Sequence, residues 1–176
     1  MPLIYITGPS CAGKSTLQRR LATVGYEAYD ADESICAWHN NTTGEKVNYP
    51  HNMRHRDHDW QDDNTFLIDE HIVKKLYTTS RTKTVFILGN ATNEIEIAKK
   101  YFDIVLCLEI DEETMAERLL SRTTNRYGKD PDQMAVVRKW FKPTMDRYRL
   151  HGAIMIDATQ PLEDVVNQVL KAIKIL

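Results

Sequence analysis

The feature that most constrains the fold of this chain is a glycine-bounded loop close to its first residue. It matches the pattern G-x-x-x-x-G-K-S/T at every fixed position. The two glycines allow a tight turn in which successive backbone N–H groups point inward, and such a cradle binds phosphate oxygens. The lysine can reach the β- and γ-phosphates of a nucleotide, and the serine hydroxyl can ligate Mg²⁺. The predicted ATP-binding loop comprises Gly8, Pro9, Ser10, Cys11, Ala12, Gly13, Lys14 and Ser15, followed by Thr16.

The segments on either side of the loop strengthen this prediction. Residues 2–7 have the β-branched and apolar middle of a short buried strand. After the loop, Leu17, Leu21 and Val24 recur at helical spacing, and Gly25 supplies a stop. The alternative is a glycine-containing turn that ends in Lys-Ser by coincidence, and such a turn would not need a strand before it and a helix after it. The flanks therefore favour a nucleoside triphosphate site.

Apolar runs and helical patterns alternate along the rest of the chain. The apolar runs are continuous, as expected for parallel strands that are covered on both faces. In one predicted helix, Ile68, Ile72 and Leu76 share a face. The alternation predicts a single α/β domain over 1–176, a three-layer sandwich around a five-stranded parallel sheet. The predicted strands are 2–7, 27–29, 84–88, 104–108 and 153–156, and the predicted helices are 62–78, 94–101, one after Asp111 and one from Pro161.

Composition narrows the classes of partner. The chain has 176 residues, a formal net charge of −2 and three cysteines. This charge gives no electrostatic footprint for a nucleic acid, and the cysteines are too few for a disulfide framework. No apolar run approaches the roughly 18 residues of a membrane helix, and the first residues do not resemble a signal peptide. We therefore expect a cytoplasmic monomer or homodimer with no nucleic-acid or membrane partner.

Two stretches, 38–60 and 123–132, do not fit the alternation. In α/β sheets the ligand lies beyond the carboxyl ends of the strands, where the connecting loops are long. We predict that the first stretch is an insertion that binds a phosphoryl acceptor and that the second is a lid, although both could be ordinary surface excursions. Arg54 and Trp60 could hold anionic and planar parts of the acceptor. The histidines near them have no spacing typical of a metal site.

Two carboxylates, Asp30 and Asp32, directly follow the second predicted strand. Asp30 could hold Mg²⁺ while Asp32 accepts a proton from an attacking hydroxyl. The alternative is that one of them only caps the short helix that follows. Their place beside the phosphate-binding loop favours the catalytic interpretation.

Two arginines, Arg118 and Arg122, lie four residues apart on one helical face. Guanidinium groups stabilise the negative charge that spreads over the oxygens of a transferring phosphoryl group. Arg138 lies on the next helical segment and could contact the acceptor. The alternative for these arginines is a solvated face paired with nearby glutamates.

Taken in order, these motifs resemble the small P-loop kinases of the nucleoside-monophosphate-kinase-like group, which includes adenylate, shikimate and gluconate kinases. The resemblance covers nearly the whole chain. It implies that the first carboxylate of the D-x-D, Asp30, supports Mg²⁺ and that the second, Asp32, contacts the acceptor hydroxyl. It also implies that Arg118 stacks on adenine and that Arg122 reaches a phosphate.

Two further segments enter through the resemblance. Residues 157–161 are similar to the late loop that borders adenine, which places Thr159 and Pro161 beside the nucleotide. Shikimate kinases carry a run of glycines after the third strand, but this chain has Gly-Asn-Ala-Thr-Asn there. We therefore expect Asn90 and Asn93 to bind the acceptor.

The sequence thus predicts ATP-dependent phosphoryl transfer to a hydroxyl of a small polar metabolite. Lys14, Arg122 and Mg²⁺ would stabilise the transferring group, and Asp32 would orient or deprotonate the hydroxyl. A nucleotide kinase, whose acceptor is a phosphate, is the first alternative. A nucleotide-dependent switch or an ATPase without an acceptor is the second, although the chain contains neither D-x-x-G, nor N-K-x-D, nor two adjacent glycines.

Overall fold

The centre of the protein is a five-stranded parallel sheet. The computed structural model describes residues 1–50, 60, 62–123 and 128–174, except for the side chain of Trp140. All four neighbouring pairs of strands in this sheet run parallel, as the continuous apolar runs predicted. The strand order is β2 (Glu27–Asp30), β6 (Val85–Leu88), β1 (Leu3–Thr7), β7 (Ile104–Glu109) and β8 (Ile154–Asp157).

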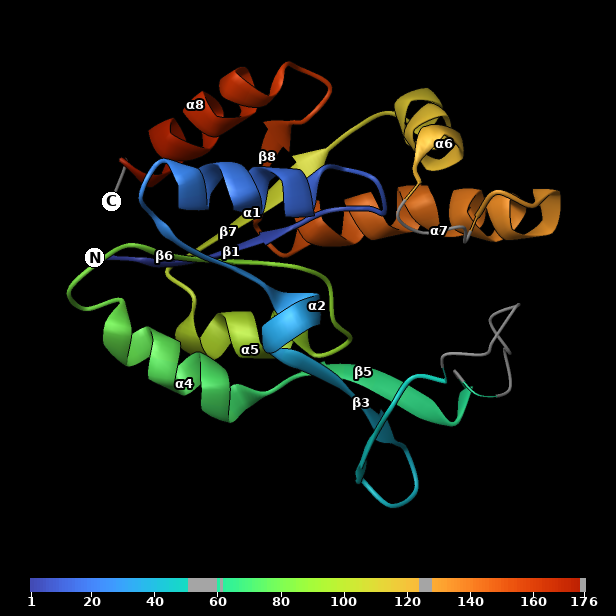
Figure 1. The fold of residues 1–176 in the computed structure, drawn as a ribbon, viewed down its shortest axis with the longest axis horizontal. Helices are drawn as coiled ribbons and strands as arrows, with labels where there is room; N and C mark the ends of the chain where they lie inside the picture. The colour runs from blue at the N-terminus through green and yellow to red at the C-terminus, as the bar shows by residue number, and fades with distance from the viewer. Residues whose placement is uncertain (51–59, 61, 124–127, 175–176) are drawn as a thin grey trace.

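Helices cover both faces of this sheet, which confirms the predicted three-layer α/β fold (Figure 1). One face packs against α1 (Lys14–Thr23) and α8 (Leu162–Ile173). The opposite face packs against α4 (Glu70–Thr79), α5 (Glu94–Tyr101) and α7 (Pro131–Leu150). Two more helices, α2 (Ala31–Ser34) and α6 (Glu112–Ser121), follow β2 and β7. Within the described part of the chain, no helix has both the length and the apolar character that a membrane span requires.

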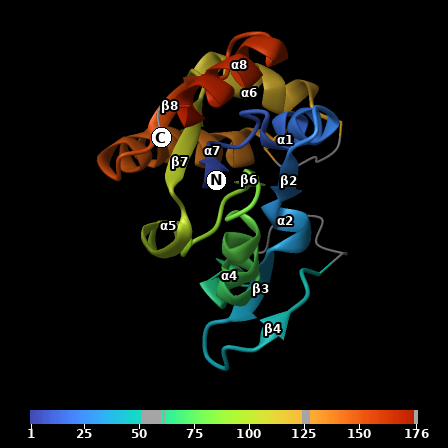
Figure 2. The ribbon, with the colours of Figure 1, turned by 90° about the vertical axis from the view of Figure 1, so that its left-hand side faces the viewer.

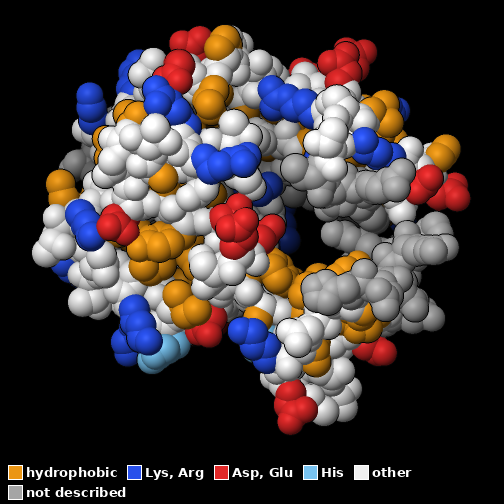
Figure 3. Space-filling view, viewed as in Figure 1, with side chains coloured by type: hydrophobic (Ala, Val, Ile, Leu, Met, Phe, Trp, Pro, Cys, Tyr) orange, Lys and Arg blue, Asp and Glu red, His pale blue; other side chains and the backbone are white. Residues whose placement is uncertain are grey.

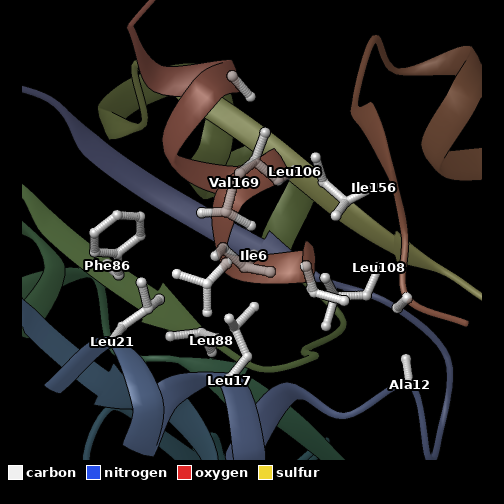
Figure 4. Packing of buried hydrophobic residues seen from close by; sticks show 14 of the residues in the cluster. Ile6, Ala12, Leu17, Leu21, Phe86, Leu88, Leu106, Leu108, Ile156 and Val169 are labelled. Atoms are coloured by element: carbon white, nitrogen blue, oxygen red, sulfur yellow. The ribbon is translucent and has the colours of Figure 1, made fainter. Parts of the chain in front are cut away.

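The two faces are built from alternate residues of each strand, because successive strand side chains point to opposite sides. On the α1 face, Ile6 packs with Leu17, Leu21 and Val169 (Figure 4). On the other face, Tyr5 belongs to the cluster that contains residues of α4 and α5. Burial on both sides fixes the register of β1, whose carboxyl end carries the phosphate-binding loop.

A second, smaller sheet was not predicted. It is antiparallel, and it projects away from the parallel sheet (Figure 2). The predicted helix 62–78 is wrong over its first part, since residues 64–68 form a strand, and the predicted insertion 38–60 begins inside a strand. The strand order is β4 (Lys46–Val47), β3 (Cys36–Asn40) and β5 (Asn64–Ile68).

Long-range pairing explains this difference. Trp38 of β3 lies opposite Phe66 of β5, and aromatic cross-strand pairs stabilise antiparallel strands. The helix starts only after Asp69, whose Oδ1 accepts hydrogen bonds from the backbone N–H groups of His71 and Ile72. Ile68 is therefore a buried strand residue, whereas Ile72 and Leu76 lie on α4 as predicted.

The predicted lid, 123–132, overlaps the start of a helix. Pro131 is the first residue of α7, a position that proline favours because its missing N–H has no partner there. Residues 124–127 of the lid lie outside the described residues, as do 51–59 of the predicted insertion.

Candidate active site

The phosphate-binding loop joins β1 to α1 and depends on glycine at its first position. Gly8 has φ of +150°, and a Cβ atom there would lie 2.7 Å from the carbonyl oxygen of Leu108 in β7. Any side chain would therefore push the loop away from the sheet. Gly13 has φ of +98° and immediately precedes α1, whose N-terminal N–H groups form an anion site. Cys11 is the only non-glycine residue of the described chain with positive φ, at 64°.

Lys14 lies over the loop that precedes it. Its Nζ donates hydrogen bonds to the carbonyl oxygens of Gly8, at 2.8 Å, and of Pro9, at 3.0 Å. Burial lowers the pKa of this ammonium group, and the charges of Asp32 and Glu94 oppose that shift. The third N–H of the ammonium group can serve a ligand. A poorly solvated ammonium at this point favours an anion in the loop.

The Ser15 hydroxyl and the Asp30 carboxylate lie side by side. Ser15 Oγ donates to Asp30 Oδ2 at 2.8 Å. The other oxygen, Asp30 Oδ1, accepts from the backbone N–H of Asp32 at 3.1 Å and so caps α2. Asp30 therefore serves as the helix cap that the sequence allowed while also contacting the loop. Hydroxyl and carboxylate oxygens are the ligands that Mg²⁺ prefers, so this pair fits the predicted metal site.

No group of three or more His, Cys, Asp or Glu residues in the described chain could hold a metal ion. A magnesium ion at Ser15 and Asp30 would take its remaining ligands from water and phosphate, which is typical of nucleotide-bound Mg²⁺. The histidines at 51, 55 and 58 lie outside the described residues.

Asp32 stands at the start of α2 and faces the end of β6. Burial and, next, the charge of Asp30 raise the pKa of its carboxyl group, while Lys14 and the backbone N–H of Asn90 oppose the shift. The approach is close because residue 89 is glycine. A Cβ atom at Gly89 would lie 2.5 Å from Ala31 Cβ and 3.3 Å from Asp32 Oδ1. A glycine directly after an apolar strand is the sequence signal for this contact, which sequence analysis missed.

A large cleft joins these groups. Its volume is about 1470 Å³, and both Lys14 and Asp32 line it. Figure 3 shows the molecule hollowed here, with hydrophobic side chains gathered at the side of the hollow near β3 and β5. All nine predicted loop residues from Gly8 to Thr16, together with Arg118 and Arg122, also line the cleft.

The structure brings together only some of the residues that were predicted to lie beside adenine. Arg118 donates from Nη2 to the carbonyl oxygen of Ala158 at 2.9 Å, and Arg122 follows the last turn of α6. Thr159 and Pro161 are not among the described residues that line the cleft; their neighbours Ala158 and Gln160 are. The Thr159 hydroxyl instead bonds to Asp157 Oδ1 at 2.5 Å, and Pro161 precedes α8.

The structure separates the residues predicted for the acceptor. Asn90 lines the cleft, but Asn93 does not. Asn93 Oδ1 accepts from the N–H of Ile68 at 2.8 Å, and its Nδ2 donates to the Ile68 carbonyl at 3.1 Å. Both ends of this amide therefore hold the end of β5, which is a structural role, and contact of Asn93 with the acceptor stays a prediction. Arg138 Nε lies 3.6 Å from Glu112 on the exposed surface, and Arg54 lies outside the described residues.

The aromatic residues that line the cleft differ from the one that the sequence predicted to hold the acceptor. Trp60 is not among the described residues that line the cleft, whereas Trp38, Tyr49 and Phe66 are. Trp60 packs edge-on behind them, with its ring centroid 5.0 Å from that of Trp38 and 5.1 Å from that of Tyr49. We call Trp38, Tyr49 and Phe66 the aromatic wall. Its sequence signal is weak, because the three residues belong to different segments.

A buried carboxylate behind the cleft was also missed. Glu94, at the start of α5, is 3% exposed. Its oxygens accept hydrogen bonds from Tyr5 OH, Thr7 Oγ1 and Tyr148 OH at 3.0, 3.2 and 2.8 Å. Burial first, and then the charge of Glu94, raise the pKa of both tyrosines, so they stay protonated as donors. This network ties α5 and α7 to the end of β1.

Comparison with known proteins agrees with this architecture. Residues 4–138 match a family model described as "AAA domain". The chain belongs to this AAA domain family. No curated protein matches the sequence of this AAA domain protein.

Solved structures resemble the AAA domain protein over nearly its full length. A shikimate kinase from Acinetobacter baumannii, in complex with shikimate, is 24% identical with a TM-score of 0.65, and the match covers 98% of this chain and 93% of that chain. A gluconokinase from Sinorhizobium meliloti 1021 is 18% identical with a TM-score of 0.58, and the match covers 97% of this chain and 90% of that chain. These similarities show that the chain has the fold of the small P-loop kinases.

Proposed function

We propose that this protein transfers the γ-phosphoryl group of ATP to a hydroxyl of a small polar metabolite. The observation that carries the proposal is that Lys14 of the phosphate-binding loop and the carboxylate of Asp32 line the same cleft. A cation for phosphate and a base for a hydroxyl are the two groups that this reaction needs. Kinases of similar fold whose names specify shikimate and gluconate support the same class of reaction.

Each step can be assigned to groups on opposite sides of the cleft. The acceptor hydroxyl oxygen forms a bond to the γ-phosphorus, the bond to the bridging oxygen breaks, and ADP leaves. Asp32 accepts the hydroxyl proton, and its raised pKa suits a group that must take up a proton during the reaction. Lys14 and Arg122 stabilise the charge on the transferring oxygens.

The nucleotide occupies the loop side of the cleft in this proposal. The N–H groups of the loop and of the first turn of α1 hold the phosphates, and Arg118 borders the base. Ser15 and Asp30 would hold Mg²⁺, which would supply positive charge that neutralises the phosphates. Cytoplasmic location and a monomeric or homodimeric state stay predictions from the sequence.

The proposal is tested by supplying purified protein with ATP, Mg²⁺ and a panel of hydroxylated metabolites. ADP release should rise with at least one acceptor, and mass spectrometry should detect the phosphorylated product. Asp32→Asn should abolish transfer while the affinity for ATP stays near that of the wild type. Glu33→Gln, an exposed neighbour on α2, is the matched control and should keep its activity. Slow ATP hydrolysis that no metabolite changes would instead identify a switch or a simple ATPase.

A further inference from the structure

The acceptor side of the cleft is dominated by aromatic rings. The ring centroid of Trp38 lies 5.1 Å from that of Phe66 and 6.0 Å from that of Tyr49. All three side chains are only partly buried, and all three line the cleft. Rings packed this way leave aromatic surface facing the cleft. Such a surface favours a flat, apolar partner over a fully hydrated polyol.

Hydrogen-bond donors and acceptors fix the orientation of the Asn90 side chain. The Thr7 hydroxyl and the Tyr148 hydroxyl each have one proton, and each donates it to Glu94. Both hydroxyls must therefore accept the bonds that they make with Asn90 Nδ2, at 3.0 and 2.8 Å. The amide group uses both of its hydrogens in this buried network, and its oxygen is left on the opposite side.

Asn90 thus offers a hydrogen-bond acceptor beside Asp32. The two residues line the same cleft, and the backbone N–H of Asn90 opposes the rise in the pKa of the Asp32 carboxyl group. Among the described residues, no group donates a hydrogen bond to Asn90 Oδ1. Two neighbouring acceptors, one of them a carboxylate, match a ligand that presents two hydrogen-bond donors.

Charge separates the two sides of the cleft. On the described parts of α2, the antiparallel sheet and the loop after β6, the lining residues include one carboxylate and no cation. The described cations that line the cleft come from α1, from α6 and the residue after it, and from α7. These cations are Lys14, Arg19, Arg118, Arg122 and Lys139.

From the aromatic wall, the fixed amide of Asn90 and this charge distribution, we propose that the acceptor is an uncharged alcohol carried by a flat heteroaromatic ring. This inference rests on the proposed function and specifies the class of its substrate. The ring stacks on Trp38 and its neighbours, the reacting hydroxyl gives its proton to Asp32, and a second donor bonds to Asn90 Oδ1. Nucleosides and hydroxymethylpyridines such as pyridoxine share this chemistry.

The test compares adenosine, cytidine and pyridoxine with shikimate and gluconate as acceptors, all with ATP and Mg²⁺. One of the first three should have a kcat/KM at least about tenfold above that of either acid, since aromatic stacking contributes at this scale. The arms of the panel distinguish a nucleoside from a pyridine alcohol. Transfer only to shikimate or gluconate would overturn this inference and leave the proposed function standing. If none of the five is phosphorylated, this inference is overturned, and the proposed function is overturned as well if no metabolite of the wider panel raises ADP release.

Two variants test the aromatic wall itself. Trp38→Leu should raise the KM of the preferred flat-ring acceptor by about tenfold or more while leaving the KM for ATP unchanged. Trp60→Leu is the matched control, because Trp60 packs on the same rings without lining the cleft. Its KM for the acceptor should stay within about twofold of wild type. An equal effect of both substitutions would show that only the folding of the small sheet matters, and it would contradict stacking on Trp38.

Discussion

Replacing Glu94 by glutamine tests how much the buried network that ties α5 and α7 to β1 contributes to stability. Glu94 Oε1 accepts from Tyr148 OH at 2.8 Å and from Arg147 Nη2 at 3.2 Å. Oε2 accepts from Tyr5 OH at 3.0 Å and from Thr7 Oγ1 at 3.2 Å. Glutamine is nearly the same shape but has only one oxygen. In either orientation, its NH₂ group meets donors where the carboxylate offered a lone pair.

The expected loss of stability follows from the number of hydrogen bonds that the carboxylate accepts. Hydrogen bonds to a charged group contribute about 1.5–3 kcal/mol each. The hydroxyl groups can turn and accept from the new NH₂, which recovers part of the loss. Arg147 is about half exposed, with 45% of its side chain accessible, so its bond counts for little. We expect Glu94→Gln to lower the free energy of unfolding by about 2–4 kcal/mol.

Urea denaturation at neutral pH measures this change. Glu96→Gln is the matched control, because Glu96 lies on the same helix and makes an exposed ion pair with Lys100 at 2.8 Å. Glu96→Gln should lower the free energy of unfolding by no more than about 0.5 kcal/mol, as is usual for surface ion pairs. If the two substitutions lower the unfolding free energy equally, the network contributes no more than a surface contact and the reasoning is refuted.

Three further predictions concern the cleft. Lys14→Ala should lower kcat/KM by about 10²–10³-fold in steady-state assays, because a preorganised charge is lost, and unchanged turnover would contradict its role. Asp32→Asn should raise the unfolding free energy at pH 7. Because folding raises the pKa of the Asp32 carboxyl group, this group contributes most to stability below its ordinary pKa of 3.8, and the contribution is lost as the pH rises through the folded-state pKa. That gain should vanish at low pH, and a gain that persists there would point to another cause. Cys11→Gly should raise the melting temperature, since φ of 64° costs a non-glycine residue about 1 kcal/mol; a lower melting temperature would mean that the thiol packs usefully.

Local sequence was sufficient for the parallel sheet. Short apolar runs before and after helical patterns predicted all five strands, and the runs are longest where the central strands β1, β6 and β7 are largely buried on both faces. It was insufficient for residues 64–68, where an apolar helical spacing concealed a strand. The pairing of Phe66 with Trp38 overrides that spacing, and the cap at Asp69 delays the helix. Neither interaction can be inferred from the pattern of one segment.

The same distinction holds for individual side chains. Asn90 and Asn93 are equivalent in sequence reasoning, since both are amides in the loop after the third predicted strand. In the structure, Asn93 bonds at both ends to the backbone of Ile68, while Asn90 bonds to Thr7 and Tyr148 and lines the cleft. Partners more than twenty residues away decide which of the two lines the cleft.

The amino-acid sequence by itself determined the nucleotide side of this protein. Its loop is contiguous, and backbone turns and a helix N-terminus create the anion site from neighbouring residues. Only the tertiary structure decided the acceptor side. The aromatic wall, Asn90 and the Glu94 network come from segments as far apart as Thr7 and Tyr148, and only the packing of helices on two sheets brings them together.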